Sequence, residues 1–281
     1  MNYLFILGRN PELSIAELQA YFHIENYERF RNAILSKIQK PIDKNTIEHL
    51  GGTIAIGEVL AQGKIQEIIN QLENKILTAR SSNKLNYAIW DFTDNEISEI
   101  KDYLKQRFKQ ERFKATEKHI HGSIKLENKN IVENIPSDAN IDEQYFLFQY
   151  KKEICFGKIT QIYNAKEQET RDMSKPVRRE ALAISPRLSK IMINLANLKQ
   201  GQTMLDPFCG IGVILQEALL QNIKVIGIDK DPETIQGAKQ NLEWANFKKE
   251  NYQLINNDST KFKINSNANT IVTEPNLGTI L

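Results

Sequence analysis

Hydrophobic residues in the first 60 positions alternate between the spacing of strands and that of helices. An apolar run at residues 3–7 predicts a buried strand, and an Asn-Pro pair followed by apolar residues at helical spacing predicts a helix from Pro11 to about Phe22. Two short strands, a short helix and a further strand are expected near residues 24–31, 33–38, 42–50 and 53–61. This β-α-β-β-α-β order predicts an N-terminal ferredoxin-like α+β domain over residues 1–60.

Residues 61–163 continue with a second α/β pattern. Apolar residues fit helical spacing from Lys64 to Arg80 and again from Ile97 to Phe108, and a strand is predicted between them at residues 85–92. Further strands are expected around residues 119–126, 144–150 and 153–162, the last two forming a hairpin. We therefore expect a second domain over residues 61–163.

Basic residues are concentrated in the middle of this second domain. Nine Lys and Arg residues, against four Asp and Glu, lie between positions 101 and 129. Lys101, Lys105, Lys109 and Arg112 recur at helical spacing and therefore share one face. Charge alone favours a solvated helix face, and the alternative is a surface that follows the phosphates of a nucleic acid.

The C-terminal part of the chain has the pattern of a nucleotide-binding fold. Residues 164–180 lack a strong hydrophobic period and are predicted to be a linker to a last domain, residues 181–281. In that domain a helix from Pro186 precedes a strand ending at Asp206, and the turn Gly210-Ile-Gly212 then opens another helix. Later strands are expected at residues 224–228, 252–255 and 270–273. This order predicts a Rossmann-like α/β domain.

Acidic residues end four successive strands of this last domain: Asp206, Asp229, Asp258 and Glu274. Any one alone is more often a helix cap or a loop residue, but four in phase beside a glycine turn predict a ligand site. Asp229 follows Asp206 by 23 residues, close to the spacing of an acid that accepts from ribose hydroxyls. A dehydrogenase is the alternative, but Leu215 stands where its third glycine belongs. A cofactor with an adenosyl group and a cationic sulfonium suits the carboxylates better than a pyrophosphate does.

Composition narrows the class of protein. The chain has 281 residues, 41% of them hydrophobic and 26% charged, as in ordinary globular proteins. The net charge of +2 means that affinity for nucleic acid must come from local patches. Two distant cysteines and four histidines argue against a metal site and a disulfide framework. No run approaches the roughly 18 apolar residues of a membrane span, so we expect a cytoplasmic protein without membrane contact.

The chain resembles a known family over nearly its whole length. Leu205-Asp-Pro-Phe-Cys-Gly-Ile-Gly212 is similar to the first motif of class I S-adenosylmethionine-dependent RNA methyltransferases. The match extends to four upstream stretches, residues 3–18, 51–60, 171–178 and 184–188. Together they resemble the THUMP-domain tRNA guanosine-10 N2-methyltransferases. The resemblance implies a ferredoxin-like N-terminal domain, a THUMP domain that binds tRNA, and a class I methyltransferase domain.

The resemblance also implies roles for individual residues. S-adenosylmethionine would be held by Asp206, Phe208, Cys209, Gly210, Gly212, Asp229, Lys230, Asp258 and Ser259, with Asp229 at the ribose and Asp258 at the adenine amino group. tRNA would contact Lys101, Lys105, Lys109, Arg112 and Lys118, and a small activator subunit is a further implied partner. The catalytic motif would be Glu274-Pro275-Asn276-Leu277, which orients the guanine amino group while the base is flipped from its stack.

This motif departs from the family pattern of Asp/Asn-Pro-Pro-aromatic. Glu274 has one more methylene than aspartate, and misplacement of a reacting group by about 1 Å is costly. Leu277 offers no aromatic face, and base–aromatic stacking is worth roughly 1–3 kcal/mol. The family's sheet has seven strands and only four are expected here, so we expect the chain to be a fragment of a longer protein. By itself it should bind the cofactor weakly or not at all.

Three functions are open at this point. A tRNA guanine-N2 methyltransferase is preferred because it accounts for both the acidic strand ends and the basic middle region. A non-catalytic tRNA-binding protein would account for the altered motif at residues 274–277. A methyltransferase acting on another RNA amino group or on DNA is the third, and the THUMP-like region argues against DNA.

Overall fold

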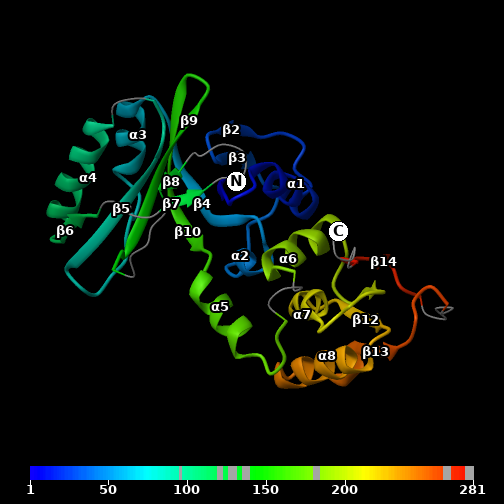
Figure 1. Ribbon diagram of the computed structural model, residues 1–281. Helices are drawn as coiled ribbons and strands as arrows, with labels where there is room; N and C mark the ends of the chain where they lie inside the picture. The colour runs from blue at the N-terminus through cyan, green and yellow to red at the C-terminus, as the bar shows by residue number, and fades with distance from the viewer. Residues whose placement is uncertain are drawn as a thin grey trace. The chain divides into compact units, whose positions relative to one another are not determined.

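The computed structural model describes residues 1–94, 97–118, 123–125, 132–134, 140–179, 184–261 and 267–275 (Figure 1). Contacts between residues divide the chain into two compact units. The first contains residues 1–12, 24–47 and 53–163, and the second contains residues 13–23, 48–52 and 164–281. Two short N-terminal segments therefore belong to the unit that is otherwise built from the C-terminal part of the chain.

The first unit is built on one eight-stranded sheet, in the order β2-β3-β1-β4-β10-β9-β5-β6. Its first four strands are antiparallel to their neighbours: β1 (Asn2–Leu7), β2 (Glu28–Phe30), β3 (Ala33–Lys37) and β4 (Thr53–Gly63). β1 lies inside the sheet, and its apolar residues 3–7 are all buried. With α1 (Pro11–Phe22) and α2 (Thr46–His49), these strands follow the β-α-β-β-α-β order expected from the sequence.

The other four strands continue the same sheet: β5 (Lys84–Phe92), β6 (Lys114–Glu117), β9 (Glu143–Tyr150) and β10 (Glu153–Ile162). β10 pairs with both β4 and β9, which joins the two halves. The helices α3 (Ile65–Leu72) and α4 (Ser98–Gln110) lie side by side on one face of this half (Figure 1). They bury Leu72 and Phe108 in a core that also holds Tyr87 and Tyr145. A separate two-stranded ribbon pairs β7 (Ser123–Lys125) with β8 (Val132–Asn134).

Several elements of this unit differ from the sequence-based expectation. The helix expected from Lys64 to Arg80 ends at Leu72, because the chain turns back and buries Leu77 in the same core. Ile76, which the helical spacing placed inside, is 84% exposed. The strands β6 and β8 were not predicted, since they are short and carry no run of apolar residues.

The second unit contains a four-stranded parallel sheet in the order β13-β12-β11-β14. Its strands are β11 (Thr203–Asp206), β12 (Lys224–Asp229), β13 (Tyr252–Asn256) and β14 (Thr270–Ile271). The helices are α5 (Ala165–Ser174), α6 (Pro186–Leu195), α7 (Val213–Leu220) and α8 (Pro232–Trp244), and a short 3₁₀ helix, η1, covers Lys249–Asn251. Strands and helices alternate from β11 onward, so the Rossmann-like arrangement predicted for this part of the chain is confirmed. The helix α5 lies in the stretch predicted to be a linker.

A buried carboxylate ties the two N-terminal segments into this second unit. The side chain of Glu17 in α1 accepts hydrogen bonds from the backbone nitrogens of Gly51 (2.8 Å) and Gly52 (2.7 Å) and from Nδ2 of Asn194 in α6 (2.7 Å). Nε of Arg187, also in α6, donates to the carbonyl oxygen of Gly51. Burial raises the pKa of Glu17, and these donors act against that rise.

Candidate active site

The turn after β11 is held open by backbone geometry that favours glycine. Gly210 and Gly212 have φ angles of 53° and 85°, a left-handed conformation that other residues adopt only at a cost. Gly212 is the N-cap of α7, so the helix begins directly at the turn. The nitrogen of Cys209 donates to the carbonyl oxygen of Ile228 in β12 (2.9 Å), which fixes the turn against the neighbouring strand.

Asp229 connects the ends of β11 and β12. Its Oδ2 accepts from the nitrogen of Gly210 (3.0 Å), and its Oδ1 accepts from the nitrogen of Asp231 (3.0 Å). One carboxylate therefore orders both the glycine turn and the start of α8. It lies at the carboxyl edge of the parallel sheet, where open α/β sheets bind their ligands.

Asp206 connects the ends of β11 and β14 in the same way. Its Oδ1 accepts from the nitrogen of Phe208 (3.1 Å) and from the hydroxyl of Thr273 (2.7 Å), the residue before Glu274. Its Oδ2 is buried and has no hydrogen-bond partner among the described residues. The pKa of Asp206 is raised to about 6. Burial is the main cause, the charges of Asp229 and Glu274 add to it, and the two hydrogen bonds act against it.

Asp258 and Ser259 follow β13 at the same edge. The Oδ1 of Asp258 accepts from the nitrogen (3.0 Å) and the hydroxyl (2.7 Å) of Thr260, and Lys261 lies 3.5 Å from its Oδ2. The hydrogen bonds from Thr260 lower the pKa of Asp258, so this carboxylate is ionised at neutral pH.

These strand ends surround one cavity of about 760 Å³. Eight of the residues expected to bind cofactor or substrate line it: Phe208, Gly210, Asp229, Lys230, Asp258, Ser259, Glu274 and Pro275. Asp206, Cys209 and Gly212 are not among the lining residues. Cys209 is buried, which raises the pKa of its thiol. The expected catalytic residues Asn276 and Leu277 lie outside the described part of the chain.

Sequence reasoning missed two charged residues of this cavity, Arg179 and Asp231. Nη2 of Arg179 lies 3.3 Å from Oδ2 of Asp231, and both side chains line the cavity. The run of basic residues at 175–179 was the available signal, but nothing in its spacing shows that it lies against the start of α8.

The chemistry of the cavity suits a cationic adenosyl ligand. Four carboxylates, those of Asp229, Asp231, Asp258 and Glu274, line it, and the unpartnered oxygen of Asp206 is buried behind them. A ligand with a positive centre and sugar hydroxyls would satisfy these acceptors, whereas a pyrophosphate would be repelled by them. These carboxylates therefore fit the S-adenosylmethionine expected from the sequence.

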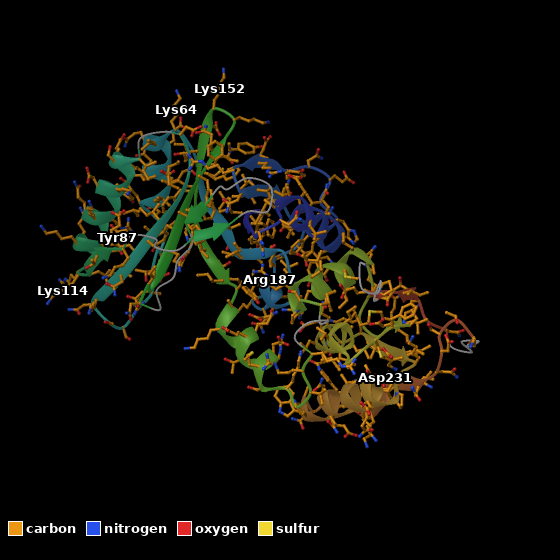
Figure 2. The ribbon with its side chains drawn as sticks, viewed as in Figure 1. Lys64, Tyr87, Lys114, Lys152, Arg187 and Asp231 are labelled. Carbon is orange, nitrogen blue, oxygen red and sulfur yellow. The ribbon has the colours of Figure 1, made fainter. Side chains whose placement is uncertain are left out.

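Of the residues expected to share one helix face, Lys101, Lys105 and Lys109 lie on α4, but Arg112 lies past the end of this helix with a φ of 65°. Lys118 follows β6. Lys101 is paired with Glu117 (2.8 Å), and Lys105 lies 3.9 Å from Asp102. Lys109, Arg112 and Lys118 are exposed. Lys114, on β6, is also exposed and was not among the expected residues (Figure 2).

Residues 175–280 match the family described as "RMKL-like, methyltransferase domain". The chain carries a methyltransferase domain of this family. The resemblance to methyltransferases and the enzyme class read from the sequence are thereby confirmed, and the fold class agrees with a solved structure described below. A class I methyltransferase domain takes its methyl group from S-adenosylmethionine, so the expected cofactor is confirmed as well.

Two curated relatives of this chain carry the same name. A tRNA (guanine(10)-N2)-dimethyltransferase of Pyrococcus abyssi is 27% identical over 287 residues, covering 99% of this chain and 79% of the relative. An enzyme of the same name from Methanothermobacter thermautotrophicus is 35% identical over 96 residues, which is 34% of this chain and only 28% of that relative. The crystal structure of TrmN from Thermus thermophilus shares the fold, with a TM-score of 0.53 at 12% identity, over 99% of this chain and 80% of that one.

The described residues were also searched for metal-binding groups and for membrane-spanning helices. They include no group of three or more His, Cys, Asp or Glu residues that could hold a metal ion. Among them, no helix is long and apolar enough to cross a membrane.

Proposed function

We propose that the methyltransferase transfers methyl groups from S-adenosylmethionine to the N2 amino group of a guanine in tRNA, at guanosine 10. The observation that carries the proposal is the position of Glu274. It follows β14 and lies at the rim of a cavity whose other strand ends suit the adenosyl cofactor. The names of the curated relatives support both the base and its position.

The chemistry needs an acceptor for the protons of the amino group. The bound cofactor supplies a methyl group on a cationic sulfonium. The lone pair of a guanine N2 is delocalised into the ring. A carboxylate that accepts a hydrogen bond from the amino group increases the electron density on this nitrogen. Within the described residues no hydrogen bond occupies the carboxylate of Glu274, so it is available to a substrate.

Asp206 holds the two groups that would meet the base. One of its oxygens binds the nitrogen of Phe208 and the hydroxyl of Thr273, so the positions of Phe208 and Glu274 are set together. The side chain of Phe208 is 45% exposed and is the aromatic ring among the described residues that line the cavity. The sequence assigned Phe208 to the cofactor, and we propose that its ring also contacts the flipped base, where Leu277 offers no aromatic face.

The remaining acids would hold the cofactor. We assign Asp229 to the ribose hydroxyls, because its second lone pairs remain available after it has ordered the glycine turn. Asp258 and Ser259 would meet the adenine amino group, and Lys230 would close the cavity beside them. Gly210 lets the backbone approach the methionine part closely, while Asp206, Cys209 and Gly212 support the turn from behind.

tRNA binding is assigned to the basic face of the first unit, at Lys101, Lys105, Lys109, Arg112 and Lys118. The division into a ferredoxin-like domain (1–60), a THUMP domain (61–163), a linker (164–180) and a catalytic domain (181–281) is part of the same proposal. A small activator subunit and a cytoplasmic location stay predictions from the sequence.

Methyl transfer to unmodified tRNA, measured with radiolabelled cofactor, tests the proposal. We expect label in the tRNA with the full-length protein and a loss of at least tenfold in rate for Glu274→Ala. Glu274→Gln should retain more activity than Glu274→Ala, because its amide oxygen can still accept a hydrogen bond from the guanine amino group. Glu99→Ala, on the exposed first turn of α4, is a control that should leave the rate unchanged.

Two results would contradict the proposal. Cofactor binding without label transfer would favour the non-catalytic tRNA-binding protein. Unchanged transfer by Glu274→Ala would show that another group accepts the amino proton.

A further inference from the structure

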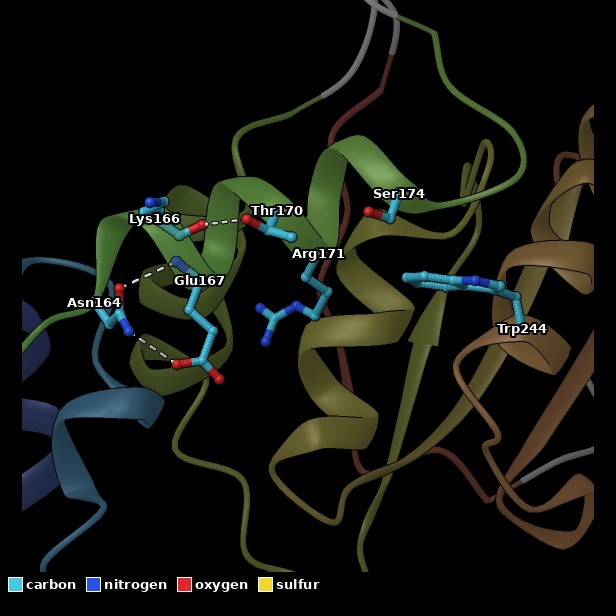
Figure 3. Close-up of a pocket in the computed structure, with 7 residues that line it drawn as sticks. All are labelled: Asn164, Lys166, Glu167, Thr170, Arg171, Ser174 and Trp244. Atoms are coloured by element: carbon cyan, nitrogen blue, oxygen red, sulfur yellow. Dashed lines mark hydrogen bonds between the residues drawn. The ribbon is translucent and has the colours of Figure 1, made fainter.

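Trp244, the last residue of α8, lies in a groove of about 540 Å³ beside α5 (Figure 3). Its side chain is 39% exposed, while Leu242 of the same helix is fully buried in the core. The indole extends toward α5, from which Arg171 points into the same space (Figure 3). The other lining residues are polar and all belong to α5 or to its N-cap: Asn164, Lys166, Glu167, Thr170 and Ser174.

Arg171 is held in place before any ligand arrives. Its Nη2 donates to Oε1 of Glu217 (3.0 Å), a residue of α7 whose side chain is only 4% exposed. Lys190 lies 3.8 Å from the other oxygen of Glu217. The guanidinium therefore keeps one orientation, and within the described residues its other two nitrogens have no hydrogen-bond acceptor. A fixed guanidinium with two available donors is suited to a phosphate.

The wall formed by α5 is also ordered by its own hydrogen bonds. Asn164 caps the helix by accepting from the nitrogen of Glu167 (3.1 Å), and Thr170 donates its hydroxyl to the carbonyl oxygen of Lys166 (2.8 Å). Between positions 164 and 179 the chain carries five basic and three acidic residues. Lys166 and Arg171 are the cations among the lining residues, and Glu167 is the acid. The groove thus combines a planar aromatic surface with a fixed cation.

A second segment connects this groove with the candidate active site. The nitrogen of Val177 donates to Oδ1 of Asn241 (2.9 Å), and Nδ2 of Asn241 donates back to the carbonyl oxygen of Val177 (3.0 Å). The chain after α5 therefore runs along α8 until Arg179 meets Asp231 at the cavity. Thirteen helical residues span roughly 20 Å at 1.5 Å per residue, a distance of only a few nucleotides.

We propose that this groove binds a single unpaired nucleotide of the substrate RNA, with its base stacked on the indole of Trp244 and its phosphate on Arg171. Unpaired bases in RNA are commonly recognised by stacking on aromatic rings, and phosphates by arginine. The proposal rests on the proposed function only in taking tRNA as the RNA. It adds an RNA contact in the second unit that is separate from the cavity holding the cofactor.

The two tryptophans of the chain give a direct test. Trp90 is 3% exposed and donates Nε1 to Gln144 (2.8 Å), so a polar quencher such as acrylamide reaches Trp244 preferentially. We expect unmodified tRNA to protect Trp244 from acrylamide, and the protected signal to be absent in Trp244→Phe. Trp244→Ala should raise the Kd for tRNA roughly tenfold, whereas Trp244→Phe, which keeps an aromatic face, should stay within about threefold of the native chain.

A matched control separates stacking from general loss of apolar surface. Leu220, at the end of α7, has the same 39% exposure and lies outside the groove, so Leu220→Ala should leave the Kd for tRNA unchanged. All variants should keep the thermal unfolding midpoint of the native chain to within a few degrees, because Trp244 contributes little to the core.

The outcomes distinguish this inference from the proposed function. If tRNA binds and is methylated but leaves the quenching of Trp244 and the Kd of Trp244→Ala unchanged, the groove is not an RNA site and the inference is wrong. If tRNA protects Trp244 and no methyl group is transferred, the inference stands and the proposed function fails.

Discussion

Asp206 is the residue on which the chemistry of the candidate site depends most. It is 1% exposed, yet it ties the glycine turn to the strand that carries Glu274 and keeps one oxygen without a partner among the described residues. A buried carboxyl with an unsatisfied oxygen costs stability unless a ligand completes it. The cost is understandable if the cofactor, which carries positive charge, is the missing partner.

This position of Asp206 predicts how cofactor affinity depends on pH. Its pKa is raised to about 6, so the carboxyl in the ligand-free protein is ionised above pH 6 and protonated below it. A cationic ligand favours the ionised form, so affinity should be constant above about pH 7 and should fall by up to tenfold per pH unit below pH 6. Isothermal titration of the full-length protein between pH 5 and 8 measures this profile.

The substitution Asp206→Asn supplies the control for that profile. It keeps an oxygen for Phe208 and Thr273 but removes the charge, so cofactor affinity should be weaker at pH 7.5 and should lose most of its dependence on pH. A native chain whose affinity is flat from pH 5 to 8 would contradict the role assigned to Asp206.

At the scale of elements, the strands and helices of the second unit follow from the sequence because each has its own apolar pattern. The ends of β11, β12 and β14 could be located from acids that follow apolar runs, and parallel strands bring such ends to one edge. The same pattern could not reveal α5, in which Gln168 is the buried residue, since no apolar period marks it.

Residues that act through tertiary contacts were not accessible to sequence reasoning for a related reason. Arg179 and Trp244 reach their cavities only because α8 and the chain before it lie together, which no local spacing encodes. Glu17 is a charged residue of a helix, yet it is fully buried and bonded to Gly51, Gly52 and Asn194. Neighbours distant in sequence decided all three positions.

The carboxylate of Glu17 should be a large single contribution to the stability of the second unit. In Glu17→Gln one oxygen becomes an NH₂ group facing a backbone N–H donor, so a buried donor loses its acceptor and stability should fall by roughly 2–3 kcal/mol. Glu12→Gln, in the first turn of the same helix and 67% exposed at its side chain, should change stability by less than about 1 kcal/mol. Chemical denaturation of the whole chain compares the two, and equal effects would show that the buried network is not what ties α1 to α6.

In the whole molecule, RNA binding and methyl transfer are assigned mainly to different units. The first unit offers exposed basic residues on and after α4, and the second contains the cofactor cavity and the groove at Trp244. A net charge of +2 is too small to attract tRNA by itself, so binding must depend on these local sites.

Removing charge from the first unit should therefore weaken tRNA binding without touching the chemistry. The triple substitution of Lys105, Lys109 and Arg112 by alanine should raise the KM for tRNA and lower the salt dependence of its Kd, since each lost phosphate contact reduces the slope by about 0.7–0.9. The Kd for S-adenosylmethionine should not change. Filter binding over a range of salt concentrations measures the slope, and an unchanged slope would place the RNA contacts elsewhere.

The identity of the methylated nucleoside defines the reaction that this protein catalyses. Unmodified tRNA is incubated with the full-length protein and S-adenosylmethionine, digested to nucleosides, and analysed by mass spectrometry, with nuclease mapping of the modified position. We expect N2-methylated guanosine at position 10, and we expect no N2-methylated guanosine with Glu274→Ala. Methylation of adenosine or cytidine instead, or cofactor binding with no methylated nucleoside at all, would contradict it.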